Sequence, residues 1–232
     1  MLIDLIVDII NGDASGVYIV AVLGTVVGFL FSLSLHELAH GYAAYTQGDG
    51  YAKAAGRLTL NPFKHLDPIG TLLMMICGFG WAKPVPIVPA NFKNGRKSMF
   101  IVALAGVICN ILLATILIFI LYFLQYICKV PFIGNTWMLV LGVIIYNVAH
   151  ANIALCIFNL IPVPPLDGYR VVKNIFINAK NQFTFIKLER YSMVLTFGLM
   201  LVLSRTTVLD KVIDAVSGGI IQLMDLIFGA YI

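Results

Sequence analysis

The sequence predicts an all-α, polytopic membrane protein with about four transmembrane helices. Of its 232 residues, 60% are hydrophobic and only 11% are charged, and the mean hydropathy is +0.96. Soluble globular proteins have about 25% charged residues, so this composition excludes that class. Residues 98–128 carry no charge at all, and this run exceeds the roughly 20 apolar residues that one helix needs to cross a bilayer.

The first part of the chain is expected to form a surface helix, one spanning helix and a short segment of another kind. Residues 2–12 place two aspartates four apart among Leu and Ile, which is typical of an amphipathic helix at the membrane surface. The first spanning helix should run from about 16 to 45, because the glycines at 48 and 50 then interrupt the pattern. Within 69–90, an apolar stretch too short to cross is followed by three prolines, which indicates a re-entrant or β-like segment.

The second part of the chain contains the remaining spanning segments. A second helix is expected within 98–128, and a third from near Thr136 to a point before Pro162. A fourth is expected from about 191 to 209. The stretch 212–232 repeats polar or glycine positions at helical spacing, which fits either an amphipathic helix at the interface or a fifth crossing packed on its neighbours. We interpret residues 1–232 as a single transmembrane domain, with a catalytic core over about 17–170.

The charges of the loops predict the orientation in a plasma membrane. Seven Lys or Arg residues lie between 46 and 98 and five between 168 and 190, whereas only Lys129 lies between 129 and 137. By the positive-inside rule, both basic loops face the cytoplasm and the N-terminus lies outside. The net charge of +4 therefore reflects topology and contact with the lipid bilayer. No nucleic-acid partner is expected, because the basic residues are spread along loops without interleaved aromatic residues.

The segment HELAH, residues 36–40, follows an uncharged apolar run. Residues four apart share one face of a helix, so His36 and His40 can bind one metal ion, while Glu37 points about 100° away and can hold a water molecule. This arrangement predicts a zinc hydrolase with one Zn²⁺ per chain. The alternative is a pair of histidines that neighbouring hydrogen bonds satisfy. Ionisable groups at membrane depth are usually functional, which favours the metal site.

A catalytic zinc ion usually has three protein ligands, so a third ligand must come from elsewhere in the chain. Glu189 is better explained as part of a surface ion pair in a basic loop. The other candidates are Asp49, Asp67, Asp167, His65 and His150. Asp167 is the strongest, because NLIPVPPLDG ends a spanning helix with three prolines and frees the backbone to bring a carboxylate to the metal.

The sequence resembles the site-2 protease family of intramembrane zinc metalloproteases, whose two signatures are HExxH and NxxPxPxLDG. Both are matched in full, and the connecting GRLTLNPFKHLDPIGTL and FGWAKPVPI also resemble the small bacterial members. The similarity covers about residues 33–169. The resemblance is to members without PDZ or CBS domains.

The resemblance assigns roles to individual residues. It implies that His36, His40 and Asp167 bind zinc and that Glu37 is the general base and acid. It also implies that Asn159 helps to hold the substrate or the oxyanion.

Two further groups of polar residues each allow two interpretations. The family often has Gly-Pro in a GxxxN pattern, whereas this chain reads AGVICN, with Val107 in the proline position. For Gly106 and Asn110, close helix packing with an interhelical hydrogen bond is favoured over direct chemistry. His65 and Asp67, in FKHLDP, are a second candidate metal or substrate group, but a turn is the favoured interpretation.

The predicted function is hydrolysis of peptide bonds within or near the transmembrane segments of membrane proteins, in regulated intramembrane proteolysis. An extended substrate could pair with the chain around 84–89, or with the unwound IPVPP, by strand addition. A non-catalytic zinc-binding scaffold and a metal or proton transporter are the alternatives. A structural zinc site has no use for a base such as Glu37, and the inverted repeats common in transporters are not evident in the sequence.

Overall fold

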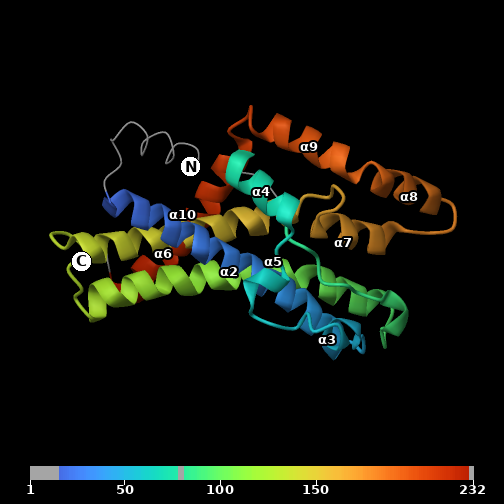
Figure 1. The fold of residues 1–232 in the computed structure, drawn as a ribbon, viewed down its shortest axis with the longest axis horizontal. Coiled ribbons are helices and arrows are strands. Elements are labelled where there is room, and N and C mark those ends of the chain that lie inside the picture. Colours follow the sequence, from blue (N-terminus) through green and yellow to red (C-terminus); the bar gives the residue numbers. More distant parts are fainter. Residues whose placement is uncertain (1–15, 78–80, 230–232) are drawn as a thin grey trace.

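Three long helices form the centre of the molecule. The computed structural model describes residues 16–77 and 81–229. Helices α2 (Gly16–Thr46), α5 (Arg96–Tyr122) and α6 (Thr136–Asn159) lie side by side, and each contacts the other two (Figure 1). All three are long and apolar enough to cross a membrane. The expected all-α, polytopic fold is confirmed.

Contacts between these helices fix their relative directions. Helices α2 and α6 run parallel, because Gly24 faces Ile144 and Gly28 faces Val148. Helix α5 runs antiparallel to both, between the basic loop and a π-helical turn at Phe123–Ile127. Gly24 and Gly28 let the backbones of α2 and α6 approach closely, as small residues commonly do between membrane helices.

The segment between α2 and α5 combines short helices with extended chain. Its elements are α3 (Tyr51–Ala54), η1 (Pro62–Lys64), α4 (Pro68–Cys77) and η2 (Pro89–Asn91). Within the described part of this segment, β pairing is confined to one antiparallel bridge between Leu66 and Ala82. The β-like segment expected in this region is therefore an extended stretch of chain, and it follows a ten-residue helix.

The fourth spanning helix expected over 191–209 is not continuous, although the two helices that replace it are together apolar enough for one broken span or a re-entrant loop. Helix α9 (Ser192–Leu203) ends, and α10 (Val208–Phe228) begins after a bend of 77°. The break follows from the polar sequence SRTT at 204–207. Side-chain hydroxyls there donate to carbonyls of the last turn, Ser204 Oγ to Leu201 O at 2.9 Å and Thr206 Oγ1 to Leu203 O at 3.3 Å.

The C-terminal region continues as helices, which lie around the bundle. Helices α7 (Asp167–Phe176) and α8 (Gln182–Arg190) precede α9. Helix α10 packs on α5 and α6 through a cluster that includes Ile213 and Met224. The surface helix expected over 2–12 lies outside the described residues.

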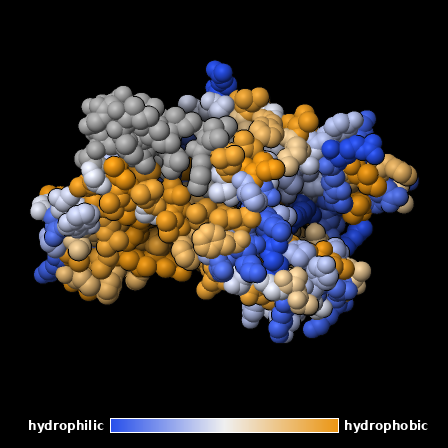
Figure 2. Space-filling view, in the orientation of Figure 1, coloured by the Kyte–Doolittle hydropathy of each residue, from blue (hydrophilic) through white to orange (hydrophobic). Residues whose placement is uncertain are grey.

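Apolar side chains cover the surface of the bundle. Figure 2 shows a continuous hydrophobic area over α2, α5 and α6, and hydrophilic residues at the end that carries α3 and α7. Exposed apolar residues such as Val27, Leu112 and Leu139 contribute to this belt. A surface of this kind is stable in contact with lipid, so the protein is a multi-pass membrane protein.

Candidate active site

Two imidazoles and one carboxylate converge inside the bundle. His36 and His40 lie one turn apart on α2, and their Nε2 atoms are 3.1 Å apart. Asp167 Oδ2 lies 3.0 Å from His40 Nε2 and 3.3 Å from His36 Nε2. All three side chains are buried. The structure thus brings together the three residues that the sequence singled out.

This group of donor atoms fits a zinc ion. Zinc–ligand bonds of about 2.0–2.1 Å in a tetrahedral arrangement place ligand atoms about 3.3 Å apart, close to the separations of the three atoms here. Two histidines and one carboxylate are also a donor set found at catalytic zinc sites. Within the described residues, these three form the group of His, Cys, Asp and Glu side chains able to hold a metal ion.

Backbone contacts hold the rings of the two histidines in place. His40 Nδ1 lies 2.7 Å from Val102 O on α5. Donation to this carbonyl leaves the lone pair of Nε2 directed at the centre of the site. Gly106 faces both rings, and a Cβ atom at this position would lie 2.4 Å from His40 Nε2 and 2.5 Å from His36 Cε1. Close packing at Gly106, as expected, is observed.

Asp167 is brought to the histidines by a tight turn between α6 and α7. A Cβ atom on Gly168 would lie 2.1 Å from Leu160 O, so the chain can fold back this closely only with glycine here. Helix α9 holds the same turn, because Thr196 Oγ1 donates to Pro164 O at 2.8 Å. The other oxygen of Asp167 lies 3.5 Å from Arg170 Nη1.

Glu37 is tied to the extended segment that follows α4. Its Oε2 atom accepts a hydrogen bond from the backbone N–H of Val85 at 2.8 Å. Sequence analysis did not reveal this contact, because any residue other than proline supplies a backbone N–H. The Val85 side chain is itself buried and faces Gly41 on α2, which fixes the segment against the helix that carries Glu37.

Asp49 is a second anchor for this segment. Its carboxylate accepts hydrogen bonds from Val88 N at 2.6 Å, Asn91 Nδ2 at 2.8 Å and Tyr51 N at 3.1 Å. Burial by itself raises the pKa of Asp49, but the three hydrogen bonds outweigh it and hold the pKa below its usual value. An acidic residue directly after the end of α2 was the only sequence signal for this role.

The remaining predicted residues do not join the cluster. Asn159 Nδ2 donates to Leu155 O of its own helix at 3.0 Å. His65 is buried and its Nε2 lies 2.8 Å from Thr59 O, while Asp67 Oδ1 accepts from Gly70 N at the start of α4. These contacts are those of a turn, the favoured interpretation. Asn110 is buried without a hydrogen bond in the described structure, so the interhelical bond expected for it is not formed.

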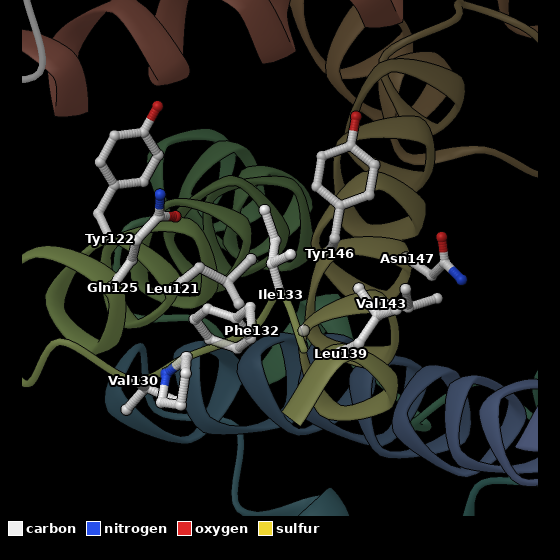
Figure 3. Close-up of a pocket in the computed structure, with 12 residues that line it drawn as sticks. Leu121, Tyr122, Gln125, Val130, Phe132, Ile133, Leu139, Val143, Tyr146 and Asn147 are labelled. Atoms are coloured by element: carbon white, nitrogen blue, oxygen red, sulfur yellow. The ribbon is translucent and has the colours of Figure 1, made fainter. Parts of the chain in front are cut away.

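A cavity lies elsewhere in the bundle. It has a volume of about 640 Å³ and opens between the end of α5 and the start of α6 (Figure 3). Its walls are mainly apolar, with Leu121, Phe132 and Val143 among the lining residues, and polar groups come from Gln125 and Asn147. The His36 cluster does not line it, so the candidate active site and this cavity are separate features.

The multi-pass bundle buries two histidines and an aspartate around one point, and a glutamate lies beside the first histidine. These features define a membrane-embedded metalloprotease. The chain belongs to peptidase family M50, which matches residues 24–203. The resemblance to site-2 proteases is thereby confirmed.

Individual relatives agree with this assignment. YwhC of Bacillus subtilis (strain 168), named as a candidate zinc metalloprotease, is 37% identical over 215 residues, which cover 88% of this chain and 91% of that protein. Rip2 of Mycolicibacterium smegmatis, named in the same way, is 28% identical over 163 residues, which cover 66% of this chain and 57% of that protein. No solved structure matches the chain significantly.

Proposed function

We propose that this protein is an intramembrane zinc metalloprotease that hydrolyses peptide bonds within or near the transmembrane segments of membrane proteins, in regulated intramembrane proteolysis. The observation that carries the proposal is the convergence of His36, His40 and Asp167 in a membrane bundle, with Glu37 next to the first ligand. Relatives named as zinc metalloproteases support zinc as the metal.

Each residue of the site has a distinct role in this proposal. His36, His40 and Asp167 hold the zinc ion. When bound, zinc supplies Lewis acidity at the scissile carbonyl and a water molecule with a pKa near 7. Glu37 takes a proton from the attacking water and delivers it to the leaving amine. Asn159 can donate to the developing oxyanion once its amide turns away from Leu155 O.

Substrate binding is proposed to involve the extended segment at 84–89. A transmembrane substrate must unwind before hydrolysis, and each backbone group it exposes in lipid then needs a hydrogen-bond partner. Extended chain beside Glu37 is suited to supply such partners by strand addition. Replacement of 84–89 by a flexible linker is expected to reduce cleavage, and an unchanged cleavage rate would contradict pairing at this segment.

The cytoplasmic half of the membrane is the proposed location of the site. If α2 ends at the cytoplasmic surface, His36 lies roughly 15 Å below it at 1.5 Å per residue. We also propose that residues 1–232 form a single domain, with the catalytic core at about 17–170.

The test compares membrane proteomes of cells that carry the wild-type protein or Glu37→Gln. A single-pass membrane protein that accumulates at full length only with the variant, while its fragment disappears, is the expected result. Glu189→Gln is a matched control, because Glu189 is the chain's only other glutamate and forms a surface ion pair with Lys173. Equal substrate and fragment levels in all three strains would argue for a scaffold or a transporter.

A further inference from the structure

Four buried polar atoms near the proposed metal site have no hydrogen-bond partner in the described structure. They are His36 Nδ1, the Nδ2 and Oδ1 atoms of Asn110, and Asn152 Oδ1. Buried polar groups in native proteins are almost always paired, so a cluster of exceptions requires a physical reason. The three residues come from three different helices, α2, α5 and α6.

Packing places these residues at the same level of the bundle. Gly106 faces the His36 ring, with the position of a Cβ atom 2.7 Å from Nδ1. Asn110 lies one turn further along α5, and its side chain leans back toward Gly106 because Cα–Cβ bonds tilt toward the helix N-terminus. Cys109 Sγ lies 3.6 Å from Leu35 O, so this turn of α5 is also packed on α2 next to His36.

Asn152 lies about one helical turn from His36, on α6. Its Nδ2 donates to Ser32 Oγ at 2.8 Å, one turn before His36 on α2, and to Val148 O at 2.8 Å. Ser32 Oγ in turn donates to Gly28 O at 3.0 Å. Both N–H groups of the Asn152 side chain thus donate hydrogen bonds, and its Oδ1 atom remains available to a donor from α5.

The unpaired atoms include both donors and acceptors, so they can satisfy one another. When His36 Nε2 binds a metal ion, Nδ1 carries a proton and needs an acceptor. Asn110 offers an acceptor oxygen and an NH2 group with two N–H donors, and Asn152 Oδ1 is an acceptor. His40 already has its orienting partner in Val102 O, so His36 is the ligand that lacks one.

We propose that Asn110 becomes a positioning residue for His36 when the metal ion binds: Asn110 Oδ1 then accepts from His36 Nδ1, and Asn110 Nδ2 donates to Asn152 Oδ1, each directly or through one water molecule. The bonds form a relay that runs from the metal ligand through Asn152 and Ser32 to Gly28 O. The relay fixes the tautomer and the ring orientation of His36. This inference rests on the proposed zinc site and adds its outer partner.

The test measures zinc affinity of the purified full-length protein in detergent, by competition with a chelator. Asn110→Leu, which removes the acceptor at similar volume, is expected to weaken zinc binding about 10–100-fold. Asn110→Asp restores an acceptor oxygen and is expected to stay within a few-fold of the wild type. Asn147→Leu is the matched control, because its amide lies 3.5 Å from Thr25 Oγ1 instead, and its zinc affinity should not change.

Each further outcome separates the relay from simple packing. Equal affinity of wild type and Asn110→Leu overturns the proposal, as does an equal loss in the Leu and Asp variants. If Asn110→Leu does not fold, Asn152→Leu replaces it, with a smaller loss of affinity expected and no loss contradicting the relay. His36→Ala tests the site itself: if it binds zinc as tightly as the wild type, the proposed metal site fails together with the relay.

Discussion

Gly106 packs against both proposed histidine ligands, so helix packing at this residue affects the proposed metal site. A methyl group here would overlap His40 Nε2 and His36 Cε1, at 2.4 and 2.5 Å, so both rings would have to move. We expect Gly106→Ala to lower zinc affinity by at least about tenfold, because ligands displaced from their packed positions no longer converge. Zinc content of the purified protein after dialysis measures this effect.

The control for this substitution is Gly198→Ala. No atom lies within 4 Å of the Cβ position at Gly198 in α9, so alanine fits without displacement. Gly198→Ala should leave zinc content unchanged and stabilise the helix by about 0.5–1 kcal/mol. Full zinc content in Gly106→Ala would mean that the two rings have more freedom than their packing indicates.

Asp49 provides a prediction about pH. Its three hydrogen bonds hold the pKa of the folded carboxyl below the unfolded value of about 3.9. Its stabilising contribution is therefore complete above pH 4 and is lost as the pH falls through the folded pKa. We expect Asp49→Asn to reduce the free energy of unfolding by about 1–3 kcal/mol at pH 7 and by progressively less below pH 4.

Thermal unfolding in detergent between pH 7 and pH 3 measures this difference. Asp214→Asn, at an exposed position of α10, is the control and should behave as the wild type does. A difference between wild type and Asp49→Asn that does not change with pH would show that the carboxylate charge is unimportant to the three hydrogen bonds.

At the scale of residues, the structure brings together three side chains that the sequence marked as candidate metal ligands. His36, His40 and Asp167 were identified because imidazoles and carboxylates are rare and costly in a membrane, and they do converge. The contact of Glu37 with the Val85 N–H could not be identified, because a backbone donor leaves no mark in the sequence. The orientation of Asn159 depends on its rotamer, which the sequence does not determine.

Among the elements, the extended segment after α4 has the most direct link to the site. Proline at position 85 would remove the N–H that Glu37 accepts, in a segment where prolines already occupy positions 84 and 86. We expect Val85→Pro to reduce peptide hydrolysis about 10–100-fold, because the carboxylate loses its fixed position, while zinc content is retained.

The control keeps the donor and changes only the side chain. Val85→Ile retains the N–H and a branched apolar group at this buried position, so its hydrolysis rate should stay close to the wild-type rate. A normal rate in Val85→Pro would mean that the hydrogen bond to Glu37 has no part in placing the base.

The elements that the sequence predicted well are those with long apolar runs. Helices α2, α5 and α6 begin and end near the expected residues, because long segments of high mean hydropathy without charged residues leave few alternatives. The segment over 191–209 is also apolar over most of its length, but within its polar stretch 204–207 the hydroxyls of Ser204 and Thr206 bond to the preceding turn and stop the helix. A window average conceals such a local break.

At the scale of the whole molecule, the two ends of the hydrophobic belt differ in the charges of their loops. The belt over α2, α5 and α6 presents an apolar surface suited to contact with lipid (Figure 2). The loops at the end that carries α3, α7 and α8 hold most of the basic residues, whereas the loop between α5 and α6 contains only Lys129. We propose that the first end faces the cytoplasm, since translocation of clustered Lys and Arg is disfavoured.

Cysteine labelling of intact cells tests this orientation. In a variant whose four native cysteines are replaced by serine, Ile133→Cys marks the α5–α6 loop at a residue that is 93% exposed, and Lys180→Cys marks the opposite end. A membrane-impermeant maleimide should label Ile133→Cys in intact cells, and should label Lys180→Cys only after the membrane is opened. The reverse pattern would place the His36 cluster in the outer half of the membrane, and substrates would then have to be cleaved near their extracytoplasmic ends.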